Sequence, residues 1–250
     1  MLHFTAEAPL YYFIFFATLS SYNFYWLISK YSFSRIKPLQ NFLIKNLSYT
    51  FIFLLAGLGM AVSIYFMPYA YGYVLIAIAL TFLYSLPLWP IKMSGWVRKA
   101  GFLKTGLLAF TWAYVTVIIP AIPVLSLEFW PVITLFVARF LFMLMLCLIF
   151  DMRDMTVDKI HGLHSLATDL SRRNLNKLML IAFLLYVGAG FFLRMYFKDN
   201  AQVLAFAVTA LMIWGVYRMS LKKHGYFFYY FLVDGLMLLS AGATFIATKF

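Results

Sequence analysis

Charged residues are scarce in this chain, and acidic residues are the scarcest of them. Only 11% of the 250 residues are charged, with eight Asp and Glu against 20 Lys and Arg, whereas 65% are hydrophobic. A soluble domain usually has about a quarter of its residues charged, so this composition excludes one. We therefore interpret residues 1–250 as a single transmembrane helical domain. We interpret the basic excess as a signal of membrane orientation rather than of nucleic-acid binding.

Cysteine is almost absent as well. The single cysteine, Cys147, lies in the middle of an apolar run. One cysteine cannot form an internal disulfide, and it cannot supply a metal site built on several thiolates. We interpret it as a small residue of the core.

Long apolar runs are abundant, and eight of them are long enough to cross a bilayer. About 20 helical residues span a hydrocarbon core of about 30 Å. The runs predict an all-α fold, namely a polytopic transmembrane bundle of about eight helices. Their predicted limits are 8–28, 47–67, 71–89, 105–125, 129–150, 177–197, 202–219 and 227–247.

Basic residues are concentrated in alternate connections between these runs. The connections after the first, third, fifth and seventh runs carry most of the Lys and Arg residues, whereas the other connections are short. By the positive-inside rule the basic connections face the cytoplasm. This topology predicts an integral membrane protein with both termini outside the cytoplasm and the acidic segment 151–162 on the cytoplasmic side.

Three of the eight acidic residues fall within that short segment. Asp151, Asp154 and Asp158 follow directly on the apolar run that ends at Phe150. If the run continues as a helix, positions i, i+3 and i+7 share one face. Carboxylates at a membrane surface suit a hard divalent cation, which often bridges to substrate phosphates. The segment therefore predicts a metal site, with a solvated acidic loop as the alternative.

Two charged residues lie well inside the predicted membrane helices, away from the helix ends. Arg139 falls near the middle of the fifth run, and Asp234 falls about two turns into the eighth. Charges within a membrane usually face the interior of the bundle, where they find a partner. We expect both side chains to face a central cavity, where they could pair in either a structural or a catalytic role.

The acidic segment also carries a family resemblance. From Asp151 to Gly162 it reads Asp-x-x-Asp-x-x-x-Asp-x-x-x-Gly. In this form it resembles the second aspartate motif of the UbiA superfamily of intramembrane prenyltransferases. Tyr84-Ser-Leu-Pro87, followed by Lys92, looks like the Tyr-Ser-x-Pro segment of that family and its trailing basic residues. The resemblance implies a UbiA prenyltransferase-like bundle.

The chain departs from that family in its first motif. Family members generally carry Asn-Asp-x-x-Asp-x-x-x-Asp earlier in the chain, and their bundle usually has nine transmembrane helices. Here the equivalent segment begins at Asn23, with Phe24, Leu27 and Tyr31 at the aspartate positions. Half of the carboxylates that the family uses are therefore missing, and one transmembrane helix fewer is predicted.

The resemblance implies an activity and a set of site residues. It implies transfer of a prenyl group from a polyprenyl diphosphate to an acceptor of unknown identity, with magnesium as the cofactor. Asp151, Asp154 and Asp158 are then the metal ligands and catalytic residues. The residues implied to bind the diphosphate are Asn23, Tyr84, Lys92, Arg98, Lys99, Arg153 and Lys159. For the basic residues a role in topology alone is the alternative, and for Asn23 it is an interhelical hydrogen bond.

Two other functions remain open. One is a terpene cyclase of the same superfamily, in which the double bonds of the substrate capture the allylic cation. The other is a non-catalytic membrane protein that binds an isoprenoid or a lipid and has lost half of the metal site. The degenerate first motif favours the latter, and the lipid bilayer is a partner in every case.

Overall fold

The fold consists of helices throughout. The computed structural model describes residues 7–32, 38–85, 101–160, 164–197, 200–222 and 224–247. Of these residues 92% are helical and none belongs to a strand. In the described part of the chain, seven helices are long and apolar enough to cross a membrane. The predicted all-α, polytopic membrane fold is therefore confirmed.

The difference between seven such helices and the predicted eight comes from α1 (Ala8–Ser32). Its 25 residues are ample for crossing a bilayer, since each helical residue adds about 1.5 Å. Tyrosine, serine and asparagine interrupt its apolar residues, however, as at Ser20, Ser21 and Asn23. As a result α1 has the length of a membrane span but does not reach the apolar character of the other seven.

Two compact units divide the chain. We call the described residues of 4–99 the N-terminal unit and those of 100–250 the C-terminal unit. The single domain predicted from the sequence stays a prediction, and each unit is described by itself. The helices of the N-terminal unit are α1, α2 (Leu39–Lys45), α3 (Leu47–Tyr65), the short 3-10 helix η1 (Pro68–Ala70) and α4 (Tyr71–Ser85).

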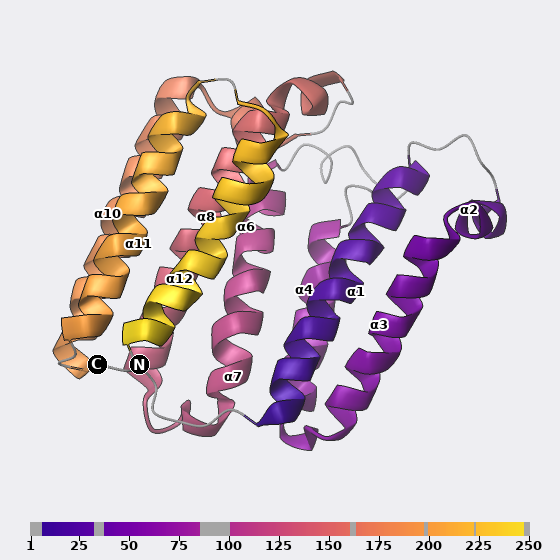
Figure 1. Cartoon of the computed structure of the whole chain (residues 1–250), viewed down its shortest axis with the longest axis horizontal. Helices are drawn as coiled ribbons and strands as arrows, with labels where there is room; N and C mark the ends of the chain where they lie inside the picture. Colours follow the sequence, from indigo (N-terminus) through magenta and orange to yellow (C-terminus); the bar gives the residue numbers. More distant parts are fainter. Residues whose placement is uncertain are drawn as a thin grey trace. The chain divides into compact units, whose positions relative to one another are not determined.

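Aromatic side chains hold the N-terminal unit together. α1 packs along α3, beside which it lies in Figure 1. Phe24 of α1 stacks on Phe53 of α3 with ring centroids 5.9 Å apart, and it meets Phe82 of α4 edge-on at 5.3 Å. Gly59 permits the close approach of α1 and α3, because a Cβ at this position would lie only 2.7 Å from the ring of Phe16. The first motif region therefore belongs to a cluster of aromatic side chains.

The C-terminal unit is built around one long helix, α8. α8 packs against both α6 and α10, and α11 packs against α10 and α12 (Figure 1). The elements in chain order are α6 (Gly101–Ala113), the π-helical η3 (Tyr114–Ile118), α7 (Ile119–Ala121), η4 (Ile122–Val124), α8 (Phe129–Ile160), α9 (Leu166–Asp169), α10 (Arg172–Phe197), α11 (Asn200–Ser220), the π-helical η5 (Phe228–Val233) and α12 (Asp234–Ala247).

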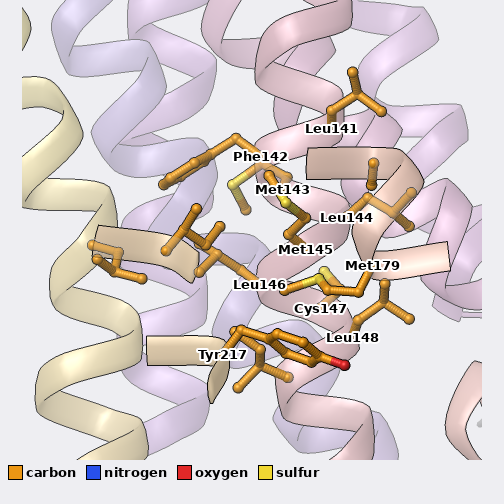
Figure 2. Packing of buried hydrophobic residues seen from close by; sticks show 14 of the residues in the cluster. Leu141, Phe142, Met143, Leu144, Met145, Leu146, Cys147, Leu148, Met179 and Tyr217 are labelled. Atoms are coloured by element: carbon orange, nitrogen blue, oxygen red, sulfur yellow. The ribbon is translucent and has the colours of Figure 1, made fainter. Parts of the chain in front are cut away.

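α8 is buried on all of its faces over more than two turns. Every residue from Leu141 to Ile149 is buried, as expected of a helix that is apolar all round and lies at the centre of a bundle. Figure 2 shows Met179 of α10 and Tyr217 of α11 in the same cluster as this stretch. Cys147 lies within it, in agreement with its interpretation as a core residue. Between membrane helices such contacts stabilise mainly through close van der Waals packing.

Candidate functional site

α8 continues without a break beyond its apolar stretch. It runs from Phe129 to Ile160, a length of 32 residues. At 1.5 Å per residue this is about 48 Å, more than a hydrocarbon core of about 30 Å requires. The apolar run therefore does continue as a helix through the acidic segment, which is the condition under which the three aspartates were expected to share one face. We call the polar residues of its last turns the charged end, which consists of Asp151, Arg153, Asp154, Asp158 and Lys159.

Asp151 connects three elements. Its Oδ2 atom accepts a hydrogen bond of 2.7 Å from the Thr105 hydroxyl of α6, and its carboxylate also accepts one from the backbone N–H of Leu166 in α9. Asp151 is half-buried and Thr105 is buried, so water does not compete strongly for these donors. The positive charge of Lys104 lies close enough to act on the same carboxylate. Asp151 therefore braces α6 and α9 against the charged end.

Polar contacts within the segment that contains α9 hold the Leu166 donor in place. The Ser165 backbone N–H donates a hydrogen bond of 2.8 Å to the Thr168 hydroxyl. Asp169 Oδ1 lies 2.6 Å from Nδ1 of His164 and accepts a hydrogen bond from Thr168 at 3.1 Å. A helix of four residues is too short to be stable alone, and these side-chain bonds satisfy its first turn.

Asp154 is engaged by its neighbour Arg153. Nε of Arg153 donates to Oδ1 of Asp154 at 2.6 Å, and Nη2 donates to Oδ2 at 2.7 Å. This two-point geometry fits the planar guanidinium to the carboxylate. The side chains are 23% and 43% exposed, so solvent screens the pair and its contribution to stability is modest. Both oxygens of Asp154 already have a donor.

Three aromatic rings surround the guanidinium of Arg153. Its central carbon lies 5.0 Å from the ring centroid of Phe150, 5.3 Å from that of Tyr229 and 5.2 Å from that of Tyr230. The two tyrosines belong to the π-helical turn η5 that begins the last membrane span. Ring faces attract a cation, most strongly where water is partly excluded.

Asp158 lies near the end of α8, where its side chain is half-buried, and Lys159 beside it is exposed. The described residues give Asp158 no hydrogen bond or ion pair. Within the part of the chain that the structure describes, no group of three His, Cys, Asp or Glu residues is placed to hold a metal ion. A magnesium ion at the charged end would therefore need diphosphate oxygens among its ligands, which is common for this ion.

The other sequence-predicted diphosphate ligands come from the part of the chain before residue 100. Lys92, Arg98 and Lys99 fall outside the described residues. Asn23 belongs to the N-terminal unit, where its Nδ2 atom donates a hydrogen bond of 2.8 Å to the Leu19 carbonyl of its own helix rather than to a second helix. Tyr84, in the same unit, is buried at the C-terminal end of α4. The roles of these five residues toward a diphosphate stay predictions.

The two intramembrane charges do not pair with each other among the described contacts. Nη1 of Arg139 donates to the Ser240 hydroxyl of α12 at 3.4 Å, and its guanidinium lies 5.6 Å from the ring centroid of Phe142. Asp234, near the start of α12, instead interacts electrostatically with Arg153. Six positions separate Asp234 from Ser240, which is about 9 Å along a helix. Arg139 therefore meets α12 well beyond Asp234.

Sequence reasoning missed three members of this site, namely Thr105, Tyr229 and Tyr230. A buried threonine at the start of an apolar run gives no signal of its own. The tyrosines did give one, because residues 226–231 are all aromatic and lie at the same end of the bundle as the predicted acidic segment. Such a cluster beside an isolated arginine is typical of a cation held by rings.

The fold defines the class of the protein as an all-α, multi-pass membrane protein. No family model matches the chain, and neither a curated protein nor a solved structure matches it. The resemblance to UbiA prenyltransferases therefore depends on the motif at 151–162 and its companion segments, and it stays a prediction.

Proposed function

We propose that the protein is a UbiA-type membrane prenyltransferase, which binds a polyprenyl diphosphate at the charged end of α8 and transfers its prenyl group to an aromatic acceptor. The observation that carries the proposal is a set of three carboxylates and two cationic side chains that follows directly on the most apolar span of the protein. A lipid with an ionic head needs both an apolar environment and charged groups beside it. In this proposal the charged end faces the cytoplasm and both termini lie on the opposite side of the membrane.

The three carboxylates have different surroundings, and we assign them different roles. Asp151 braces α6 and α9, because its oxygens accept hydrogen bonds from Thr105 and Leu166. Asp154 and Asp158 are the carboxylates that act on the diphosphate head through a cation. Lys159, which is exposed beside them, contributes a positive charge to the phosphate oxygens. The catalytic contribution is therefore expected to be larger for Asp154 than for Asp151.

The transfer consists of one bond broken and one bond formed. The bond between the allylic carbon and the diphosphate oxygen breaks, and its electron pair leaves with the diphosphate. A ring carbon of the acceptor then bonds to the allylic carbon, and the ring loses a proton to solvent. Magnesium carried by the diphosphate would neutralise part of the leaving charge.

A second candidate function is binding of an isoprenoid diphosphate without cleavage. Phe24 favours it, because this residue stands at an aspartate position of the first motif and packs against the rings of Phe53 and Phe82. A ring in that position cannot hold a metal ion. The described residues also form no three-ligand metal group. Both observations are compatible with a head group that is bound but not ionised.

Release of diphosphate tests the proposed function. The purified full chain is incubated with magnesium and with geranyl, farnesyl or geranylgeranyl diphosphate, with and without aromatic acceptors. We expect release by the wild type and a loss of about a hundredfold for Asp154→Asn, the size found when one charge-stabilising group is removed from an active site. Glu128→Gln is the matched control, since Glu128 immediately precedes α8, at the end of this helix opposite the charged end, and its replacement should leave release unchanged.

Each other outcome points to a different function. Equal release by the wild type and Asp154→Asn would contradict the role of the charged end. Release that needs no added acceptor would indicate cyclisation. No release, together with stabilisation of the wild type by a non-hydrolysable diphosphate analogue, would establish binding without cleavage. Neither release nor stabilisation would exclude isoprenoid diphosphates altogether.

A further inference from the structure

We infer that Arg153 is a positioning residue that holds Asp154, and that the π-helical turn η5 of the last membrane span holds Arg153 in turn. This inference deepens the proposed function, on which its meaning for catalysis rests, because it names the residues that set the orientation of the carboxylate assigned to the diphosphate head. It replaces the sequence-based expectation that Arg153 itself contacts the diphosphate.

First, the side chain of Arg153 points toward Asp154, its neighbour in the chain. Neighbouring residues of an α-helix diverge by about 100°, so the side chains of Arg153 and Asp154 do not meet unless one of them bends toward the other. They nevertheless form two hydrogen bonds, at 2.6 and 2.7 Å. Two of the nitrogen atoms of the guanidinium are therefore committed to Asp154 rather than to a ligand. Such a conformation needs contacts that hold the long arginine side chain in place.

The second step is the origin of those contacts. Phe150 lies one turn earlier on α8, and its ring contacts one side of the guanidinium at 5.0 Å. Tyr229 and Tyr230 come from another helix and contribute rings at 5.3 and 5.2 Å. Tyr229 is buried and Tyr230 is 58% exposed, so one ring contacts the guanidinium from the interior of the unit and the other from its surface. Together the three rings restrict the guanidinium to the position in which it reaches Asp154.

The third step is the local structure of the last span. Residues 228–233 form a π-helical turn, with one residue more per turn than the following α12 has. Adjacent side chains on a regular helix point in directions about 100° apart, yet Tyr229 and Tyr230 both contact the same guanidinium. The wider π-helical turn is the local departure from a regular helix that accompanies this shared contact. Such turns occur often at functional sites. The last membrane span therefore reaches Asp154 through Arg153.

A double-mutant cycle on ligand affinity tests this sequence of contacts. Titrations of the purified full chain with magnesium pyrophosphate compare the wild type, Tyr230→Leu, Asp154→Asn and the double variant. Tyr230→Leu should weaken binding about threefold, the size of one exposed contact between a cation and a ring. In the Asp154→Asn background the same change should have no further effect. A purely structural role of Tyr230 would weaken binding equally in both backgrounds, which would overturn the inference.

Phe231→Leu is the matched control for this cycle. Phe231 lies on the same π-helical turn and is 65% exposed, similar to Tyr230, but its ring stacks on Phe227 instead of meeting Arg153. Its replacement should leave the pyrophosphate affinity unchanged. A loss equal to that of Tyr230→Leu would show a general effect of the turn and would contradict the assignment.

A measurement without ligand separates this inference from the proposed function. If the wild type does not bind pyrophosphate, the proposed function fails, and thermal unfolding of the same variants decides the inference. The decrease in unfolding temperature of the Tyr230→Leu/Asp154→Asn double variant should then be smaller than the sum of the decreases of the two single variants, because both changes act through Arg153. The decreases for Phe231→Leu and Asp154→Asn should add fully. Full additivity for the tyrosine pair would overturn the inference.

Discussion

Arg139 and Arg153 lie about four turns apart on the same face of α8, and their surroundings differ sharply. Arg139, within the membrane, has one long hydrogen bond of 3.4 Å to Ser240 and one ring contact, to Phe142. Arg153, near the end of the span, has two short hydrogen bonds to Asp154. Three rings also surround it. Both arginines meet the last membrane span, one through a hydroxyl and the other through tyrosines.

The position of an arginine along α8 therefore determines whether its partners are charged or neutral. A carboxylate deep in the membrane has a high desolvation free energy, whereas a carboxylate at the membrane edge stays partly hydrated and has a lower one. Arg139 therefore has neutral partners, and Arg153 has an ionic one. We expect Arg139 to contribute little to stability and Arg153 to organise the charged end.

Replacement of Arg153 should have the largest effect. Arg153→Leu removes both hydrogen bonds to Asp154 and the contacts with three rings, and it leaves a half-exposed carboxylate without its cation. We expect the free energy of unfolding to fall by about 2 kcal/mol, after allowance for solvent screening of the pair. Unfolding in detergent measures the change. Arg173→Leu, an exposed position on α10, is the control and should stay within about 0.5 kcal/mol of the wild type.

The hydroxyl that donates to Asp151 should matter next. Thr105→Val keeps the shape of a buried side chain but removes the donor that lies 2.7 Å from the carboxylate. The expected loss of unfolding free energy is about 1.5 kcal/mol, because a hydrogen bond to a charged group is removed in a site with little water. Thr116→Val is the control, since the hydroxyl of this η3 residue donates to the Trp112 carbonyl of the adjoining α6 and, within the described residues, to no carboxylate. Equal losses for the two variants would contradict the bracing role of Asp151.

Replacement of Arg139 should act in the opposite direction. Arg139→Met keeps a long flexible side chain against Phe142 and removes a charge from within the membrane. We expect the free energy of unfolding to rise by about 1 kcal/mol, because a charge within the membrane that has only neutral partners is costly to bury. A loss as large as that of Arg153→Leu would show that Arg139 has an ionic partner, and the comparison between the two arginines would fail.

The smallest effect is expected for the partner of Arg139. Ser240→Ala removes the hydroxyl that accepts its bond at 3.4 Å. Hydrogen bonds between membrane helices contribute about 0.6 kcal/mol on average, and this one is long. The unfolding free energy should therefore change by less than about 0.5 kcal/mol. In the Arg139→Met background the change should vanish.

The sequence predicted the membrane fold well because its signals were local. Apolar runs, polar connections and the continuous helix through Asp151 and Asp158 depend on neighbouring residues, which a single sequence contains. The marginal case was α1, where tyrosine and serine dilute the apolar residues. The sequence prediction counted its apolar run 8–28 as a span, while its hydropathy falls below that of the other seven.

The contacts of the site could not be predicted in the same way, because they join residues far apart in the chain. Helical spacing placed the three aspartates on one helix, but it carried no information that Thr105 would bind Asp151. It also gave no reason for Tyr229 and Tyr230 to surround Arg153. The expected contact between Arg139 and Asp234 depended only on both being charged, whereas the packing of α12 placed Ser240 beside Arg139.

Photolabelling is the most direct test of a diphosphate site at the charged end of α8. A farnesyl diphosphate analogue with a photoreactive group near its diphosphate is bound to the full chain in the presence of magnesium, activated by light, and mapped by mass spectrometry. If the diphosphate binds there, labels should fall within residues 150–160. Excess pyrophosphate should remove this labelling, and Asp154→Asn should reduce it. Labels confined to the opposite ends of the membrane helices, or labels that pyrophosphate does not remove, would contradict a diphosphate site at the charged end of α8.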